Sequence, residues 1–465
     1  MLKTWLGALA AFGFWATAAS AEPSDADRAQ AREIFRHALS LDTSVEGQRT
    51  PELAAYLADL LRAGGFAAED VHVIPFEHTA SLVARYRGDG TGGRPILLLA
   101  HMDVVTARRA DWERDPFTMV EENGFFYARG ASDNKAGVAL LVSTFLQLRA
   151  QGFTPTRDLI LVFSGDEESN PRTAQALLTD HRDLIGDAEF ALNSDAGGGG
   201  LREDNGAPTA YSIQTAEKTF ATFTFTTHNP GGHSSAPRAD NAIYDLSAAL
   251  ERLRAYQFAP MWNDTTIASL RAGAELQGGD LGAAMARFAA HPGDRRAAAR
   301  LSQSPSYVGQ IRTTCVATRL AGGHADNALP QSAEATVNCR IFPGVAVADV
   351  QAQLQSLAGP GVEVAVKSAL PATDASPLRA DVMAAIAAAV HVHQPGVPIV
   401  PTMSAYYTDG MFFRAAGIPT YGVGDIFMKG SDIFSHGLNE RVPVAAFYNG
   451  LDHWRVLITE LAGRS

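Results

Sequence analysis

The chain has 465 residues, 46% hydrophobic and 19% charged, which is enough for two well-filled domains and excludes a disordered, coiled-coil or collagen-like chain. Its formal net charge of -12 and pI near 5.5 argue against a phosphate-binding surface, so we expect no nucleic-acid partner. A mean hydropathy of -0.04 and the lack of an internal apolar run of about 18 residues argue against a membrane-embedded body.

The first 21 residues are typical of a secretory signal peptide. Lys3 precedes the apolar stretch 5–16, and Ala19 and Ala21 supply small residues before a cleavage point. The apolar stretch is short for a membrane helix, and an uncleaved anchor is the alternative. We therefore expect cleavage after Ala21 and a periplasmic or secreted protein with no membrane association beyond this segment.

The mature chain begins with α/β patterning. A helix with one apolar stripe is expected after Pro51, and a second helix over 135–150. Three short runs that are apolar on both faces, 96–100, 159–163 and 190–192, indicate central strands covered by helices on both sides. Strand, helix and strand at this spacing predict an α/β sheet.

Near residue 213 the pattern changes to one-sided alternation, with Phe223 and Phe225 on one face and Thr222 and Thr224 on the other, which indicates a second sheet. The expected order of elements is βαββαβ, a small two-layer domain. Its later elements are expected at 241–256, 310–320, 333–341, 348–357 and 362–367, with an alanine-rich helical insertion at 258–304. Helix and strand patterns like those of the first 212 residues resume after about residue 370. We therefore expect a small domain inserted into a larger one.

Two cysteines, Cys315 and Cys339, fall on expected strands of the small domain. Export would permit a disulfide between them. Two buried free thiols are the equal alternative, because spacing alone does not determine which way the side chains face.

Histidine and acidic side chains follow the expected strands at their carboxyl ends, which border the ligand crevice in open α/β sheets. They are His101, Asp103, Asp166, Glu167, Glu168 and Asp195; Asp133 lies in a glycine-bearing turn at the start of the helix 135–150, and His436 lies in the tail. Each short pattern alone has a structural alternative: Asp133 could cap a helix, and 166–168 could form a solvated loop. Together they form a nitrogen and oxygen ligand set suited to a pair of zinc ions. The glycine pattern of dinucleotide sites and the nucleophile elbow of serine hydrolases are absent.

Six segments occur in the order of a known family. They are AHMDVV from Ala100, ARGASDNKAG from Ala128, SGDEES from Ser164, NSDAG from Asn193, GGHSSAP from Gly231 and SHGLNER from Ser435. Over nearly the whole mature chain the sequence resembles the dizinc amidohydrolases that include acetylornithine deacetylase, succinyl-diaminopimelate desuccinylase, aminoacylases and zinc carboxypeptidases and dipeptidases. The resemblance implies a large mixed-sheet α/β zinc-hydrolase domain at 22–212 and 369–465, with an inserted α+β lid or dimerisation domain at 213–368.

The resemblance also implies two zinc ions per chain and a role for each matching residue. One ion would be held by His101 and Asp195, and the other by Glu168 and His436, with Asp133 bridging both. Glu167 would be the general base, and Asp103 would orient His101. Asn134 stands where the family often has a second aspartate after the bridging one. This departure concerns the geometry of the local turn, which in the family often contains a cis peptide, and it leaves the metal ligands unchanged.

Three further residues of the small domain match family positions. His233 would stabilise the oxyanion, commonly across a dimer interface, with a turn histidine as the alternative. Asn327 and Arg340 would bind substrate, and Arg340 is suited to a free carboxylate. Because Arg340 alternates out of phase with its apolar neighbours it leaves the apolar face of its strand, so an exposed surface arginine is its alternative reading.

The function that the resemblance implies is an exported zinc metallopeptidase of the carboxypeptidase or dipeptidase type. It would hydrolyse an amide bond next to a free carboxylate in a short peptide, through a water that bridges the two zinc ions. An N-acyl-amino-acid deacylase of the aminoacylase type, with the same site, is the alternative. A remote alternative is an inactive metal- or peptide-binding homologue, whose sign would be the loss of Glu167 or of a ligand. The resemblance implies a homodimer, although the insertion at 258–304 could cover the surface through which relatives dimerise.

Overall fold

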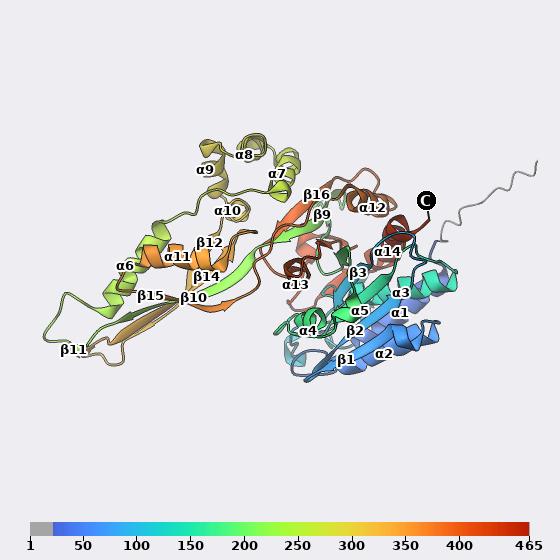
Figure 1. Ribbon diagram of the computed structural model, residues 1–465, viewed down its shortest axis with the longest axis horizontal. Coiled ribbons are helices and arrows are strands. Elements are labelled where there is room, and N and C mark those ends of the chain that lie inside the picture. The colour runs from blue at the N-terminus through green and yellow to red at the C-terminus, as the bar shows by residue number, and fades with distance from the viewer. Residues whose placement is uncertain (1–21, 465) are drawn as a thin grey trace, which may run out of the picture.

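The computed structural model describes residues 22–464, so the expected signal peptide lies outside the described residues. In that part of the chain, a ten-stranded mixed sheet and a four-stranded antiparallel sheet form the centres of a large and a small domain, which lie end to end (Figure 1). This arrangement confirms the predicted fold class. No helix within 22–464 combines the length and apolar character that a membrane crossing requires.

The large sheet has a parallel centre. Its order is β1-β2-β6-β3-β7-β17-β9-β8-β18, with β16 beside β9, and β3 pairs in parallel with both β6 and β7. The three apolar runs of the sequence are these central strands, as predicted. The strands are β1 (Val71–Phe76), β2 (Thr79–Tyr86), β3 (Ile96–His101), β6 (Leu159–Ser164), β7 (Phe190–Asn193), β8 (Gly198–Leu201), β9 (Pro208–Glu217), β16 (Ile399–Ser404), β17 (Thr420–Gly422) and β18 (Phe427–Lys429).

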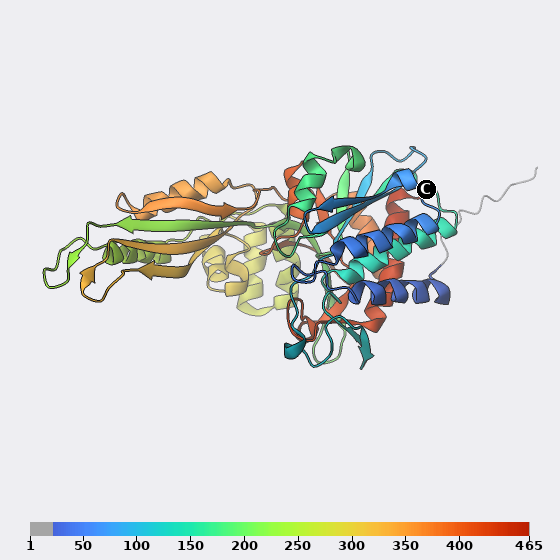
Figure 2. The same ribbon diagram turned by 90° about the horizontal axis from the view of Figure 1, so that it is seen from below.

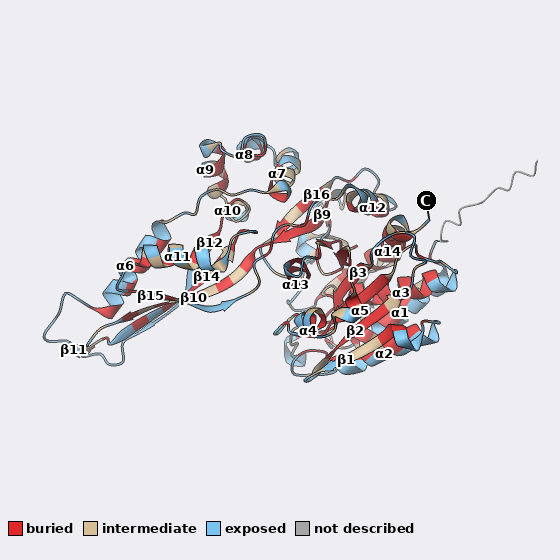
Figure 3. Cartoon of the chain, in the orientation of Figure 1, coloured by how far each residue is buried: buried red, intermediate tan, exposed pale blue. Residues whose placement is uncertain are grey.

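Helices cover both faces of the large sheet. Leu98 and Leu161 pack against one helical layer, while Leu97 and Ile160 pack against the other. The first layer contains α1 (Asp25–Leu39), α2 (Thr50–Ala63), α3 (Lys135–Ala150), α12 (Ala380–His391) and α14 (Val444–Ala462); the second contains α4 (Thr173–Thr179), α5 (Arg182–Ile185) and α13 (Gly410–Ala415). Because the central strands are buried on both sides (Figure 3), they read as continuous apolar runs.

The small sheet is covered by helices on one face only. Its order is β12-β14-β10-β15, and its core contains Phe223, Phe225 and Val337. The elements are β10 (Thr219–His228), α6 (Ala242–Ala255), β12 (Thr314–Gly322), β14 (Ser332–Ile341), α11 (Val347–Ala358) and β15 (Glu363–Ala369). This is the predicted βαββαβ order. A two-stranded ribbon, β11 (Gly232–His233) and β13 (Ala328–Leu329), lies at the end of the small domain farthest from the large sheet (Figure 1).

The helical insertion forms a small core of its own beside the junction of the two domains, as Figure 2 also shows. It comprises α7 (Asp264–Gln277), α8 (Gly279–Ala290), α9 (Arg295–Ser302) and α10 (Pro305–Val308). The hydroxyl groups of Thr265 and Thr215 are 2.6 Å apart, which ties α7 to β9 of the large sheet. The chain passes from the large to the small sheet between Glu217 and Thr219. The domain limits given above stay predictions.

A third, three-stranded sheet joins two distant parts of the large domain. It contains β4 (Val120–Glu122), β5 (Phe125–Tyr127) and β19 (Arg441–Pro443), in the order β19-β5-β4. The antiparallel pair of β5 and β19 brings the segment after Tyr127 beside the segment before Arg441.

The two cysteines, whose state the sequence leaves open, form a disulfide. Cys315 on β12 and Cys339 on β14 are directly opposite each other in the sheet register, and their sulfur atoms are bonded. The bond closes a loop with a sequence separation of 24 residues within the small domain.

We expect the unreduced, unfolded protein to contain no free thiol. Replacing both Cys315 and Cys339 with serine should lower the free energy of unfolding by about 3 kcal/mol, because the unfolded chain loses the constraint of a closed loop. Thiol titration in denaturant, with and without reductant, and urea unfolding of the double variant test this. Two titratable thiols in the unreduced protein would contradict the disulfide.

Candidate metal centre

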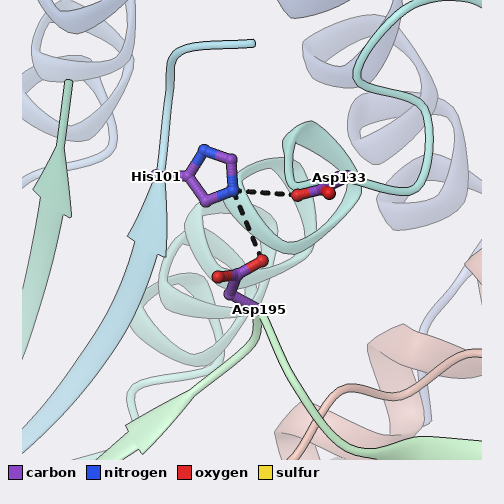
Figure 4. A group of neighbouring side chains, drawn as sticks. All are labelled: His101, Asp133 and Asp195. Atoms are coloured by element: carbon purple, nitrogen blue, oxygen red, sulfur yellow. Dashed lines mark hydrogen bonds and ion pairs between the residues drawn. The ribbon is translucent and has the colours of Figure 1, made fainter. Parts of the chain in front are cut away.

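One group of ligand atoms lies at the carboxyl edge of the parallel strands. His101 is the last residue of β3, and its Nε2 is 3.0 Å from Oδ1 of Asp133 and 3.3 Å from Oδ1 of Asp195 (Figure 4). Asp195 follows β7 by two residues, and Asp133 precedes α3. Two strand ends and the turn before α3 therefore bring these three side chains together.

A second group shares Asp133 with the first. Nε2 of His436 is 3.3 Å from Oδ2 of Asp133 and 2.9 Å from Oε2 of Glu168. The two carboxylate oxygens of Asp133 thus face different imidazoles, Oδ1 toward His101 and Oδ2 toward His436. This is the position that a bridging ligand between two ions requires.

The turn that presents Asp133 contains a cis peptide bond between Asp133 and Asn134. The side-chain oxygen of Asn134 accepts a hydrogen bond from the Ser194 hydroxyl at 2.7 Å, beside Asp195. Asn134 therefore connects this turn to the segment that carries Asp195.

Asp103 forms hydrogen bonds to two different parts of the cluster, the His101 ring and the backbone of the loop that carries Glu167 and Glu168. Its carbonyl oxygen accepts a hydrogen bond from Nδ1 of His101 at 3.1 Å, which leaves Nε2 free for an ion. Its carboxylate accepts hydrogen bonds from the backbone N–H groups of Glu167 and Glu168, at 3.1 and 3.0 Å. Asp103 therefore contacts both the His101 ring and the loop that carries the two glutamates, and its role in orienting His101 stays a prediction.

The charges of the cluster fit divalent cations. Five carboxylates gather there, those of Asp103, Asp133, Glu167, Glu168 and Asp195, with two imidazoles to offset them. Burial raises the pKa of Asp195 to about 7. Hydrogen bonds to Asp133 and Glu168 raise the pKa of His436 to about 10. A buried group of like charges is stabilised by cations, and nitrogen and oxygen donors without sulfur suit a dinuclear zinc site.

Glu167 lies beside the cluster without joining either ligand group. Its side chain is buried, and burial together with neighbouring carboxylates raises its pKa well above 4.5. Its carboxylate accepts no hydrogen bond from another residue of the described range 22–464, while its backbone carbonyl accepts one from the Tyr407 hydroxyl at 3.2 Å. The backbone of Glu167 is thus fixed while its carboxylate stays free of hydrogen bonds from the described residues, and its pKa is raised. Such a carboxylate is suited to taking up and returning a proton.

None of the three small-domain residues belongs to either ligand group. His233 and Asn327 are neighbours at the tip ribbon, where the Ser234 N–H donates to the Asn327 carbonyl at 2.9 Å (Figure 1). Arg340 lies at the other end of the sheet, and its Nη1 donates to the carbonyl of Ala405 at 2.7 Å. Their functional roles stay predictions, as do the individual roles of the ligand set.

Sequence reasoning missed several residues that shape the site. Arg129 and Glu440 form a buried ion pair beside Asp133, with Nη1 to Oε2 at 2.7 Å. Asp409, whose pKa burial raises to about 7, accepts a hydrogen bond from Ser164 at the end of β6. Arg129 and Glu440 stand inside the quoted motif segments, so their place in those motifs was a usable signal. Asp409 and Tyr407 carried none.

Comparison with known proteins identifies the family. The sequence pattern of peptidase family M20/M25/M40 matches residues 97–460, and the chain belongs to this family. It is therefore a metallohydrolase acting on C–N bonds, with the dinuclear metal site typical of the family. The resemblance noted from the six segments is confirmed.

Relatives and solved structures agree with this assignment. The N-fatty-acyl-amino acid synthase/hydrolase PM20D1 of Mus musculus is 27% identical over 462 residues, covering 92% of this chain and 86% of the relative. Aminoacylase-1A of Rattus norvegicus is 25% identical and covers 92% of this chain and 94% of the relative. The M20 family metallo-carboxypeptidase Sso-CP2 from Sulfolobus solfataricus shares the fold, with a TM-score of 0.67, 17% identity, and coverage of 93% of this chain and 99% of that chain.

We expect zinc binding by the metal-free protein to release protons. At pH 8 the His436 ring is protonated, since its pKa is raised to about 10, and a ligand imidazole must be neutral. The apparent affinity should therefore rise with pH, by about tenfold per pH unit for each proton released, until the ring is neutral without metal. Calorimetric titrations in buffers of different ionisation enthalpy count these protons, and His436→Gln should release fewer. An affinity that falls as pH rises from 7 to 9 would contradict this.

Proposed function

We propose that this member of peptidase family M20/M25/M40 is an exported dizinc hydrolase that cleaves the amide bond next to a free carboxylate in a short peptide or dipeptide. The observation that carries the proposal is the position of Asp133, whose two oxygens face the two imidazoles of separate ligand groups. A single shared carboxylate between two ion sites supports a two-metal hydrolase more than a structural metal site.

In this proposal each ion is held by one of the two ligand groups. His101, Asp133 and Asp195 would hold one zinc ion, and Asp133, Glu168 and His436 the other. Bound there, the ions would supply Lewis acidity toward the amide carbonyl and lower the pKa of a water. Glu167, next in sequence to Glu168, is the base that removes the proton of the attacking water. It then gives the same proton to the leaving amine.

Arg340 is proposed as the partner of the substrate carboxylate. Its guanidinium contacts Ala405, two residues before Tyr407, whose hydroxyl binds the backbone of Glu167. Arg340 on β14 therefore lies at the junction of the two domains, in contact with the segment that borders Glu167. An arginine at this junction can bind a carboxylate in two-point fashion while the neighbouring amide faces Glu167.

The deacylase alternative is favoured by a specific observation. The curated relatives that cover 92% of this chain are named for N-fatty-acyl amino acids and as an aminoacylase. An N-acyl amino acid presents the same amide and the same free carboxylate as a peptide, so the same residues would serve both. The two functions differ in the group on the acyl side of the bond.

Export is proposed from the first 21 residues, with their apolar stretch and the small residues before Glu22. The disulfide between Cys315 and Cys339 supports this, because disulfides persist mainly in oxidising compartments.

A substrate panel on the zinc-loaded mature protein tests the reaction. We expect turnover of dipeptides with a free carboxylate, and a rate about 10- to 100-fold lower for the same dipeptides carrying a C-terminal amide, since a charged hydrogen bond is lost. N-acetyl and long-chain N-acyl amino acids are assayed in parallel. Deacylation without any peptide cleavage would replace the peptidase with the deacylase, and equal turnover of amidated substrates would overturn the carboxylate requirement.

The matched control for this panel is Glu167→Gln. It keeps the shape of the side chain and leaves both ligand groups intact, so it should retain zinc while turnover falls by roughly 10²- to 10⁴-fold. Unchanged turnover would remove Glu167 from the mechanism.

We further propose a homodimer in which the partner subunit supplies His233. His233 lies at the small-domain tip, at the far end from the metal centre (Figure 1). β12 is an edge strand of its sheet, and Val316 and Leu320 on it are exposed, as is Tyr244 on α6 at 66%. An exposed apolar edge strand is suited to pairing with another chain, and the insertion leaves these side chains uncovered.

Mixed dimers test this arrangement. Glu167→Gln and His233→Ala should each be inactive alone, whereas differently tagged copies expressed together should recover up to about a quarter of wild-type turnover. In a mixed dimer, the His233→Ala chain keeps its own Glu167 and receives His233 from its partner. A monomer in solution, or co-expressed copies that stay inactive, would contradict the proposal.

A further inference from the structure

The two loops that carry Asp133 and His436 are held side by side by strand pairing. β5 ends at Tyr127 and β19 begins at Arg441, and these two residues are paired in the sheet register. Directly beyond the pair, the Ala128 N–H donates to the Glu440 carbonyl at 3.2 Å. The loop after β5 leads to Asp133, and the loop before β19 contains His436.

The Glu440 carboxylate, which is fully buried, binds the first of these loops at several points. Its Oε1 accepts hydrogen bonds from the Ser132 N–H at 2.8 Å, the Ser132 hydroxyl at 3.0 Å and the Asp133 N–H at 3.0 Å. Its Oε2 accepts from the Gly130 N–H at 2.9 Å and from Arg129. One carboxylate therefore fixes the backbone of the whole turn that presents Asp133.

Arg129 makes the reciprocal contact to the second loop. While its Nη1 binds Glu440, its Nη2 donates to the carbonyl groups of His436 and Gly437, at 3.4 and 3.1 Å. Its guanidinium also lies over the ring of Trp112, 5.1 Å from the centroid. His436 has a φ of 63°, a left-handed conformation that is unfavourable for a residue with a side chain, so its backbone needs such support.

We infer that Arg129 and Glu440 are positioning residues that fix the Asp133 and His436 ligands relative to each other. Each residue belongs to one ligand's loop and binds the backbone of the other's, although they lie 311 positions apart in the sequence. The inference rests on the dinuclear site, but on neither the peptidase nor the deacylase reaction. Outer residues that orient ligands in this way commonly contribute 10- to 100-fold to metal affinity.

The geometry assigns the pair unequal effects on the two ions. The group of Asp133, Glu168 and His436 has two of its three residues attached to the Arg129–Glu440 pair, whereas the group of His101, Asp133 and Asp195 has one. His101 is oriented independently by Asp103. A pair that only joined β5 to β19 would instead change the stability of the fold and weaken both ions alike.

Zinc titration of metal-free protein, in competition with a chelator of known affinity, tests this. The variants are Arg129→Lys, which keeps the charge but not the forked geometry, and Glu440→Gln, which keeps one acceptor oxygen. The matched control is Glu189→Gln, which breaks the ion pairs with Arg157 and Arg379 at the opposite end of the parallel strands. Cobalt substitution gives an independent absorption spectrum of the ligand geometry, and thermal unfolding reports stability.

In both variants we expect the ion held by Asp133, Glu168 and His436 to lose affinity by about 10- to 100-fold and its cobalt spectrum to change. The ion held by His101, Asp133 and Asp195 depends on the pair through Asp133 alone and should lose less affinity. Glu189→Gln should lower the melting temperature without a change in either affinity. Wild-type affinity for both ions in both variants would overturn the positioning role. An equal loss of affinity at both ions, in parallel with a loss of stability, would overturn it as well. If Arg129→Lys does not fold, Glu440→Gln alone decides. A wild-type protein that binds fewer than two ions would overturn the dinuclear site itself.

Discussion

The structure depends on an electrostatic constraint at the carboxyl edge of the large sheet. Acidic side chains from four loops meet there with two imidazoles, and the surrounding packing buries most of them. In the absence of cations this arrangement is unfavourable, which the raised pKa of Asp195 records. The fold supplies the energy to assemble it, because the strands that end at this edge are buried on both faces by the helical layers. Burying these like charges without cations is therefore unfavourable in free energy. The hydrophobic core offsets this unfavourable term, and bound cations would remove it.

Within this constraint, the residues around the ligands divide into two groups with separate tasks. Asp103 accepts hydrogen bonds from the His101 ring and from the backbone of Glu167 and Glu168, so it contacts one ligand group and the loop that carries Glu168 of the other. Arg129 and Glu440 act on the loops of Asp133 and His436. Asp133 is the only described ligand that belongs to both groups of the cluster. Errors in its position would affect both ions, which explains why a buried carboxylate binds its backbone directly.

In the small domain, His233 lies at the tip, away from the ligand cluster (Figure 1), although the family resemblance gives it a catalytic role. The small domain has a disulfide, a core on one face of its sheet and an exposed edge strand. The helical insertion contacts β9 of the large sheet through Thr265, and it leaves Val316 and Leu320 on the edge strand exposed. In the proposed dimer, the tip of the small domain presents His233 to the partner subunit while Arg340 stays at the junction of its own chain.

The sequence by itself determined the fold class, the order of the elements and the identity of the residues at the strand ends. Continuous apolar runs encode doubly covered strands, alternation encodes a one-sided sheet, and the residue after each strand is read directly from the chain. What only the tertiary structure decided was which oxygen of Asp133 faces which imidazole, how Arg129 meets Glu440, that Cys315 is bonded to Cys339, and that His233 lies far from the cluster. These facts depend on the approach of segments that are distant in sequence or on the direction of single side chains. Packing and strand register set both, and neither leaves a periodic signal in the sequence.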